Sequence, residues 1–351
     1  MEPNQTHQNK SEIPGIIISA LRGGSGKTIF SVGIIAALTQ RGKTIAPLKK
    51  GPDYIDAGWL ALAAGQQCYN LDTFLIPVEI ILKSFACYTQ TSDLAVIEGN
   101  RGLYDGLDLE GGCSTAELGK LLRCPVVLIV DVTMTTRTAA ALVMGCQHFD
   151  PELQIGGVIL NRVAGPRQEA LVRAGIEHYC GIPILGAVPR LKKNVFPERH
   201  MGLVPHHETE QAERAITWAR SMVEKHLHID ALWALASEAE PLEKKGLGKN
   251  ETGAERVTES RLRIGLIRDR AFWFYYPENL DQLKSLSAEI IEIDAITARH
   301  LPDVDALYVG GGFPEIQAEA LAANRTFRAS LKARIEEGLP VYAECGGLMY
   351  M

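Results

Sequence analysis

The chain has 351 residues, a formal net charge of −6 and a hydrophobic content of 46%. These values are typical of a soluble globular protein that is long enough for two domains. The acidic balance argues against a general affinity for nucleic acid or anionic membranes. The seven cysteines show no C-x-x-C spacing, so they indicate neither a zinc site nor a disulfide framework, and their odd number fits a reducing cytoplasm. The polar residues 1–12 are predicted to form a disordered tail, and no apolar run approaches the length of a membrane span.

A glycine-rich turn follows the apolar run 16–20 and precedes a predicted helix over residues 29–38. Strand, loop and helix in this order are the context of a phosphate-binding loop (P-loop), because backbone N–H groups and a helix N-terminus can then surround a polyphosphate. Lys27 is expected to reach the β- and γ-phosphates, and the Thr28 hydroxyl is expected to ligate Mg²⁺. The other residues of the predicted nucleotide loop are Gly24, Ser25 and Gly26. Leu21 stands where the usual motif has its first glycine, and the alternative is a turn that only joins a strand to a helix.

Acidic residues follow the next two predicted strands. Strand 44–48 leads into a Gly-Pro-Asp turn with Asp53, and strand 94–98 ends on Glu98. Open α/β sheets place ligands beyond the carboxyl ends of their strands, so both carboxylates are candidate Mg²⁺ ligands. Asp105, on the loop that follows, is expected to project over the same face and to contact a substrate. For Asp53 the alternative is a turn aspartate that caps the next helix, which composition alone favours.

Three further strands are predicted over residues 125–131, 155–163 and 184–189. Arg137, near the start of the helix after the first of them, is placed to reach a phosphate, with an ordinary surface arginine as the alternative. Asn161, on the second, is a candidate to hydrogen-bond the amino group of adenine. Strands that alternate with helices predict a doubly wound, largely parallel α/β sheet.

The Pro-, Gly-, Lys- and Glu-rich segment 239–261 is predicted to be a linker between domains at 13–238 and 262–351. In the second domain a strand runs directly into Cys345 and two glycines. This is the form of a nucleophile elbow, in which a tight turn exposes a thiolate at the start of a helix. A buried structural cysteine is the alternative. The N–H groups that are expected to hold an oxyanion are those of Gly311, Gly312 and Gly346.

The motifs together resemble the cobyrinic acid a,c-diamide synthase family. The resemblance implies an ATP-binding synthetase domain with a P-loop fold similar to dethiobiotin synthetase, followed by a class I glutamine amidotransferase α/β domain. It implies a ligase that uses ATP and Mg²⁺ to amidate the a and c acetate side chains of cobyrinic acid in cobalamin biosynthesis. The carboxylate would pass through an acyl phosphate, and ammonia, free or from glutamine, would displace the phosphate. The segments that carry the resemblance are 24–28, 50–56, 98–106, 202–205, 310–315 and 344–347.

The resemblance also implies residue roles. Cys345 would be the glutaminase nucleophile, and Lys27 would stabilise the transferring phosphoryl group. Tyr54 and Asp105 would contact the tetrapyrrole near the side chain that is being activated. The family's catalytic histidine lies on a later strand than the one before Cys345, so we expect an incomplete amidotransferase domain in a truncated chain, or ammonia-dependent amidation if the chain is complete.

Other functions fit the same residues. Within the family, the alternatives are a,c-diamidation of nickel-sirohydrochlorin for coenzyme F430 and of hydrogenobyrinic acid. An alternative from another functional class is a nucleotide switch like the partition ATPases, in which Arg22 would reach a partner subunit's phosphate. A homodimer is compatible with the sequence. The adjacent His206 and His207 are not predicted to bind metal, because neighbouring residues do not share a helix face.

Overall fold

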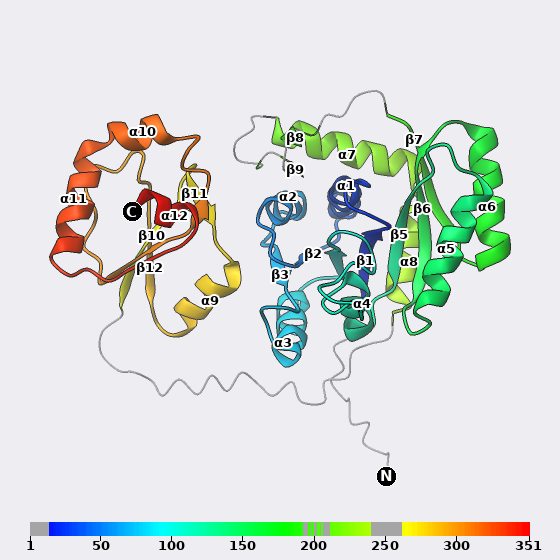
Figure 1. Cartoon of the computed structure of the whole chain (residues 1–351), viewed down its shortest axis with the longest axis horizontal. Helices are drawn as coiled ribbons and strands as arrows, with labels where there is room; N and C mark the ends of the chain where they lie inside the picture. The colour runs from blue at the N-terminus through cyan, green and yellow to red at the C-terminus, as the bar shows by residue number, and fades with distance from the viewer. Residues whose placement is uncertain are drawn as a thin grey trace, which may run out of the picture. The chain divides into compact units, whose positions relative to one another are not determined.

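The chain divides into two compact units, one within Met1–Leu247 and the other within Gly248–Met351 (Figure 1). The predicted tail, 1–12, and all but the first residue of the predicted linker, 239–261, lie outside the described residues. None of the described helices combines the length and the apolar character that a membrane crossing needs. The computed structural model describes residues 14–191, 196, 198–199, 202–203, 205, 211–239 and 262–351.

The first unit is built on a seven-stranded sheet with the order β3-β2-β4-β1-β5-β6-β7. Every neighbouring pair in it is parallel. The sheet therefore needs a helix between successive strands, and the predicted doubly wound α/β fold is confirmed. The strands are β1 (Gly15–Ala20), β2 (Ile45–Lys50), β3 (Tyr69–Leu71), β4 (Leu94–Glu98), β5 (Val126–Asp131), β6 (Ile155–Val163) and β7 (Ile184–Pro189).

Helices cover both faces of this sheet, because its central strands are apolar on both sides. Ile16 and Ile18 of β1 belong to one core, which α1, α2, α7 and α8 complete. Ile17 belongs to the other core, which contains residues of α3, α4, α5 and α6. The helices are α1 (Lys27–Gln40), α2 (Ile55–Ala64), α3 (Val78–Thr89), α4 (Thr115–Leu122), α5 (Arg137–Phe149), α6 (Pro166–Cys180), α7 (Ala212–His226) and α8 (Ile229–Ser237). A two-stranded antiparallel ribbon of β8 (Glu198–Arg199) and β9 (Gly202–Leu203) precedes α7.

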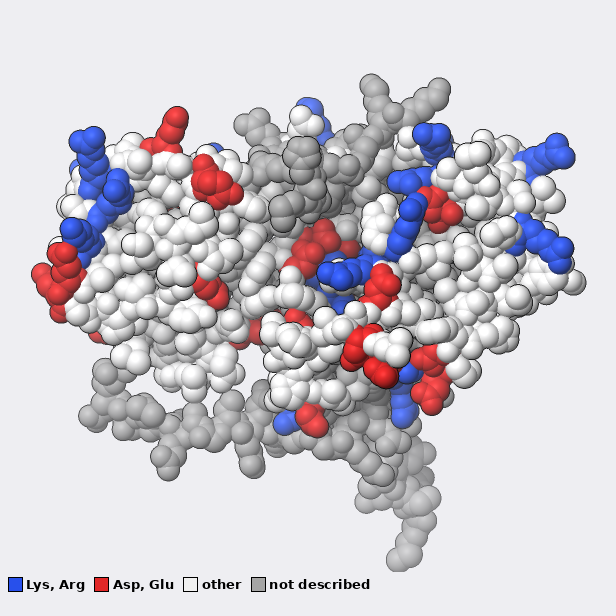
Figure 2. All heavy atoms as spheres, in the orientation of Figure 1, with Lys and Arg blue, Asp and Glu red and all other residues white. Residues whose placement is uncertain are grey.

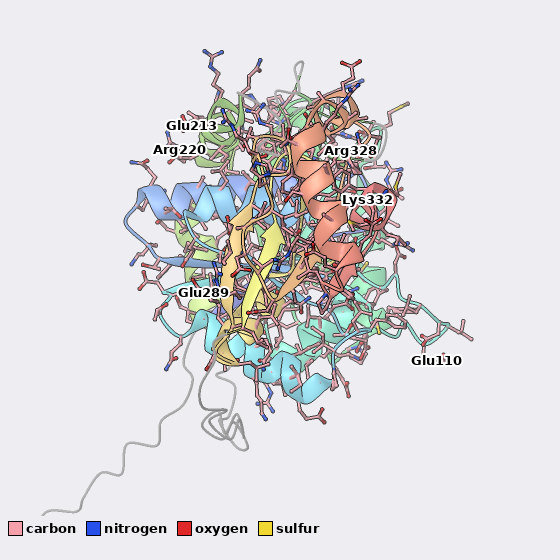
Figure 3. The ribbon with its side chains drawn as sticks, turned by 90° about the vertical axis from the view of Figure 1, so that its left-hand side faces the viewer. Glu110, Glu213, Arg220, Glu289, Arg328 and Lys332 are labelled. Carbon is pink, nitrogen blue, oxygen red and sulfur yellow. The ribbon has the colours of Figure 1, made fainter. Side chains whose placement is uncertain are left out.

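The second unit has a parallel sheet with the order β12-β10-β13-β15 and a small antiparallel ribbon of β11 and β14. Its core packs helix residues such as Phe327 and Leu331 against the strands. The strands are β10 (Arg263–Ile267), β11 (Phe272–Phe274), β12 (Glu289–Ile293), β13 (Ala306–Val309), β14 (Gly311–Gly312) and β15 (Val341–Ala343). The helices are α9 (Pro277–Ser285), α10 (Ala318–Ala323), α11 (Arg325–Glu336) and α12 (Gly346–Tyr350). Figure 3 shows Arg328 and Lys332 on α11.

Candidate active site

The predicted P-loop joins β1 to α1 at the carboxyl edge of the first sheet. Gly24 and Gly26 have φ angles of 69° and 92°, and Gly26 caps α1 in the left-handed region that glycine adopts without strain. A Cβ atom at Gly23 or Gly24 would meet nothing within 4 Å, so the loop backbone is open on this side. The first N–H groups of a helix have no partner within it, and an anion can approach them here.

A cavity of about 930 Å³ lies against this loop, within the size range of small-molecule sites. Figure 2 shows acidic and basic side chains next to one another over β1 and β2. α7 contributes Trp218 and Met222 to the lining of the cavity. The charged residues that line the cavity are Lys27, Lys49, Asp56, Glu98, Arg101, Arg162 and Arg190.

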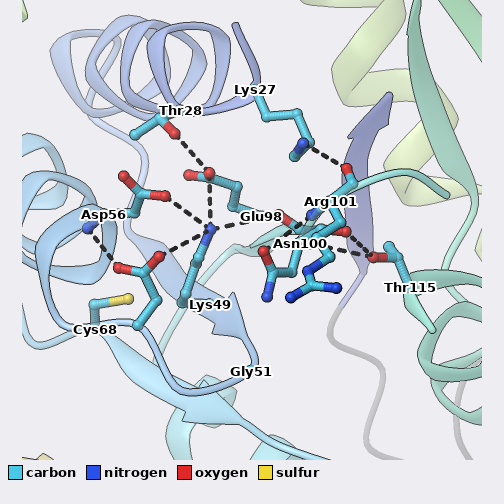
Figure 4. Close-up of polar contacts among 12 residues, drawn as sticks. Lys27, Thr28, Lys49, Gly51, Asp56, Cys68, Glu98, Asn100, Arg101 and Thr115 are labelled. Atoms are coloured by element: carbon cyan, nitrogen blue, oxygen red, sulfur yellow. Dashed lines mark hydrogen bonds and ion pairs between the residues drawn. The ribbon is translucent and has the colours of Figure 1, made fainter. Parts of the chain in front are cut away.

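Three carboxylates surround one ammonium group beside the P-loop (Figure 4). Lys49 Nζ lies 2.9 Å from Glu98 Oε1, 3.1 Å from Asp56 Oδ2 and 3.9 Å from Asp53 Oδ2. Thr28 Oγ1 donates to the same Glu98 oxygen at 2.8 Å. The register of the sheet causes this meeting, because β2 and β4 pair with Lys49 directly opposite Glu98.

The ratio of three acids to one ammonium explains how the cluster titrates. Burial alone would lower the pKa of Lys49, but the carboxylates, Glu98 first, outweigh burial and raise it. Burial raises the pKa of Glu98 and Lys49 offsets only part of that rise, so the pKa lies at about 7 instead of 4.5. Burial would also raise the pKa of Asp56, but the Lys49 ammonium outweighs it and lowers that pKa. Burial and the neighbouring Asp56 raise the pKa of Asp53. One ammonium cannot balance three carboxylates, so the most deeply buried acid retains its proton most readily.

The oxygens of this cluster fit Mg²⁺. The Thr28 hydroxyl and the Asp56 and Glu98 carboxylates line the cavity, and such hard oxygen donors are the ligands that Mg²⁺ prefers. Glu98 Oε2 is buried and has no hydrogen-bond partner in the described part of the chain, as expected of an oxygen kept for a cation. No three His, Cys, Asp or Glu side chains of the described ranges form a metal centre by themselves, and Lys49 lies among the carboxylates here.

Asp53 takes the capping alternative that the sequence left open, and Asp56, to which the sequence analysis gave no role, lines the cavity. Asp53 Oδ1 accepts a hydrogen bond from the Asp56 backbone N–H at 2.9 Å, which is the helix-capping alternative. The cavity lining includes Asp56 but not Asp53. Sequence reasoning missed Asp56 and Lys49. A signal was available for Lys49, since a lysine within an apolar strand needs a buried counter-charge.

Other predicted nucleotide contacts differ in how close they lie to the cavity. Lys27 Nζ donates to the Arg101 carbonyl at 2.6 Å, and burial lowers the Lys27 pKa. Asn161 lines the cavity, and its amide nitrogen donates to the carbonyl of Ser25 in the loop at 3.0 Å. Arg137 does not line the cavity. It is exposed and stacks on Tyr179, with its guanidinium carbon 5.1 Å from the ring centroid.

The predicted substrate residues, Tyr54 and Asp105, are not among the residues that line the cavity. Tyr54 directly precedes α2. Asp105 Oδ2 accepts from the Gly102 backbone N–H at 2.8 Å, which closes a turn at the start of the loop that ends before α4. Figure 3 shows Glu110 at the protruding end of this loop. His206 and His207 lie outside the described residues.

Cys345 stands between β15 and α12 in a tight turn, with φ 49° and ψ −121°. It is exposed, whereas the next residue, Gly346, is buried. A Cβ atom at Gly311 would lie 3.1 Å from Cys345 Cβ, and one at Gly346 would lie 3.0 Å from the Gly312 carbonyl oxygen. The structure therefore brings the predicted glycine loop and the predicted nucleophile together in the geometry that an elbow requires.

A tyrosine that sequence reasoning missed holds this glycine loop. The buried Tyr275 hydroxyl accepts from the Gly310 backbone N–H at 2.8 Å and donates to the Ile267 carbonyl. On the other side of the elbow, Tyr308 donates to Glu344, the residue before Cys345, at 2.9 Å. Phenol groups of two tyrosines thus tie both the glycine loop and the residue before Cys345 to the sheet.

Each of the two units matches a known protein family. Residues 16–204 match the CobQ/CobB/MinD/ParA nucleotide binding domain, and residues 263–351 match the CobB/CobQ-like glutamine amidotransferase domain. A protein of Magnetococcus marinus named cobyrinate a,c-diamide synthase is 47% identical over 97% of this chain and 73% of its own length. One of the same name from Archaeoglobus fulgidus is 43% identical over the same shares. Among solved structures, the signal recognition particle receptor FtsY from Elizabethkingia anophelis in complex with GDP is 14% identical, with a TM-score of 0.37 over 54% of this chain and 61% of its own. The chain belongs to the cobyrinate a,c-diamide synthase family.

Proposed function

We propose that this protein amidates the a and c acetate side chains of cobyrinic acid, with ATP as the activating substrate and glutamine or ammonia as the nitrogen donor. The names of the relatives support the substrate. The observation that carries the chemistry is the cluster of Thr28, Asp56 and Glu98 beside an open P-loop in a nucleotide-sized cavity. Such a site suits phosphoryl transfer, which needs positioning and charge stabilisation more than covalent help from the protein.

Activation of the carboxylate is the first step of the proposed reaction. A substrate carboxylate oxygen attacks the γ-phosphorus of ATP, and the bond to the β-phosphate oxygen breaks to release ADP. Lys27 and the loop N–H groups hold the phosphoryl oxygens as charge moves toward ADP. Thr28, Asp56 and Glu98 would hold Mg²⁺, which neutralises phosphate charge when it is bound. Asp105 and Tyr54 orient the side chain of the tetrapyrrole.

Amide formation is the second step. Ammonia attacks the carbonyl carbon of the acyl phosphate, phosphate leaves, and the amine loses a proton. In the second unit, the Cys345 thiolate attacks the carboxamide carbon of glutamine, the C–N bond breaks to release ammonia, and water hydrolyses the resulting thioester to glutamate. The N–H groups of Gly311, Gly312 and Gly346 stabilise the oxyanion that forms in each attack. This proposal is supported by the approach of the glycine loop to Cys345.

All seven cysteines are free, which supports a reducing, cytoplasmic location.

The test is an assay of ADP release and tetrapyrrole mass with cobyrinic acid, Mg·ATP and either ammonium or glutamine. We expect ADP and amide to form in equal amounts with ammonium. If amide formed with nickel-sirohydrochlorin or hydrogenobyrinic acid and not with cobyrinic acid, the ligase activity would stand and its substrate would be that other tetrapyrrole. ATP turnover that no tetrapyrrole raises, but that a protein or DNA partner raises, would contradict the ligase and favour a nucleotide switch.

A further inference from the structure

Lys49 is a fully buried cation at the edge of the proposed metal site. Its side chain is 2% exposed, and that of its partner Glu98 is 1% exposed. The ammonium also lies 3.1 Å from Asp56 and 3.4 Å from the Gly99 carbonyl oxygen. Burying an ammonium is costly unless charge and hydrogen bonds compensate, so these contacts hold Lys49 in a defined position.

The oxygens that hold Lys49 are also the proposed ligands of Mg²⁺. Glu98 Oε1 accepts both from Thr28 and from Lys49, and Asp56 Oδ2 faces the same ammonium. Glu98 Oε2 is left without a partner in the described part of the chain. A divalent cation that uses these carboxylates must therefore share them with Lys49 or displace it.

The charges of the cluster show what Lys49 does when no metal is present. Asp53, Asp56 and Glu98 carry three negative charges when ionised, and the single positive charge of Lys49 pairs with each of them. Without it, three carboxylates would repel one another in a site of low dielectric. Lys49 thus allows the acids to stand together in the folded protein before a cation arrives.

We propose that Lys49 is the internal counter-ion of the metal site, which competes with Mg²⁺ for Glu98 and Asp56 and so weakens the binding of Mg²⁺ without nucleotide. This inference rests on the proposed function, because it assumes the metal site at Thr28, Asp56 and Glu98. It makes Lys49 a positioning residue for the acids. Its consequence is that Mg²⁺ is held firmly only when phosphate oxygens of ATP add ligands and negative charge.

A matched control lies next to it on the same strand. Lys50 is half-buried and is not among the residues that line the cavity. Adjacent strand residues point to opposite faces of a sheet, so Lys50→Met removes the same charge and almost the same volume away from the acidic cluster. Lys49→Met removes them inside it.

The experiment titrates MgCl₂ into the metal-free full chain by calorimetry, with and without ATP, and follows thermal unfolding in EDTA and in Mg²⁺. For Lys49→Met we expect Mg²⁺ alone to bind at least about tenfold more tightly, because a neighbouring positive charge is gone. We expect its Tm in EDTA to fall by about 10 °C and to recover largely in Mg²⁺. Lys50→Met should leave the Mg²⁺ affinity within about twofold of the unsubstituted protein.

Equal or weaker Mg²⁺ binding by Lys49→Met, while the unsubstituted protein still binds Mg·ATP, would overturn the counter-ion role and leave the proposed function standing. If the unsubstituted protein showed no effect of Mg²⁺ on ATP binding, the metal site itself and this inference would both fall. Should Lys49→Met not fold in EDTA, the double variant Lys49→Met, Asp53→Asn restores the net charge and retains all three proposed ligands. It should then fold and show the tighter Mg²⁺ binding, and normal Mg²⁺ binding by that folded variant would also overturn the role.

Discussion

Gly33 lies where α1 and α7 press against each other, and Gly33→Ala tests whether that contact shapes the nucleotide cavity. An added Cβ would come within 2.5 Å of Val223 Cγ2 and 2.7 Å of the Ala219 carbonyl oxygen. The second atom belongs to the α7 backbone, so the two helices must separate for the methyl group to fit. Arg220, labelled on α7 in Figure 3, donates to Gln40 of α1 at 2.8 Å and ties the same helices together.

The expected magnitude follows from two opposing effects. Overpacking of a buried contact costs about 1–3 kcal/mol. Alanine gains about 1 kcal/mol over glycine in a helix interior. We therefore expect the free energy of unfolding to fall by about 1 kcal/mol, which lowers Tm by about 2–4 °C in a unit of this size. Because α7 carries Trp218 and Met222 into the cavity, ATP binding should also weaken.

Thermal and urea unfolding, with a titration of ATP, measure both effects. Gly145→Ala is the control, because Gly145 is an exposed glycine of α5 whose added Cβ meets nothing within 4 Å. That substitution should raise stability by about 0.5–1 kcal/mol. If Gly33→Ala were stabilised as much as Gly145→Ala, the packing argument would be refuted. If the Gly33→Ala variant were destabilised but bound ATP normally, the packing of α7 on α1 would have no influence on the nucleotide site.

Three further predictions concern the sites. Asp105→Asn should reduce tetrapyrrole turnover with little change in ATP affinity, and an equal loss of nucleotide binding in a calorimetric titration would contradict the substrate role. Cys345→Ala should abolish amidation supported by glutamine while ammonium still supports it, as product mass will show; an unchanged reaction with glutamine would place Cys345 outside glutamine hydrolysis. In metal-free protein, the raised pKa of Glu98 means that the folded state binds a proton that the unfolded chain has released, so stability should fall as pH rises from about 4.5 through about 7. Glu98→Gln should remove that fall in urea unfolding and reduce ADP release by about 100-fold or more, and an unchanged pH profile would contradict the assignment.

Local sequence patterns were sufficient for the positions of the main chemical groups. The run from the β1 strand through the glycines to Lys27 and Thr28 predicts a P-loop, because strand, turn and helix signals are all short-range. The same holds for Glu98 at the end of an apolar strand and for Cys345 before two glycines. The alternation of apolar strands with helices was enough to predict a parallel sheet.

Only the tertiary structure decided which side chains meet. The pairing of β2 with β4 brings Lys49 against Glu98, although 48 residues separate them in the chain. The direction of α2 turns Asp56 into the cavity and leaves Asp53 to cap the helix, a choice that two acids three positions apart do not reveal. Arg137 stacks on Tyr179 because α5 and α6 pack side by side. A sequence by itself determines where strands end and which groups they carry, whereas strand order and helix packing, which depend on burial of the whole core, determine which groups share a site.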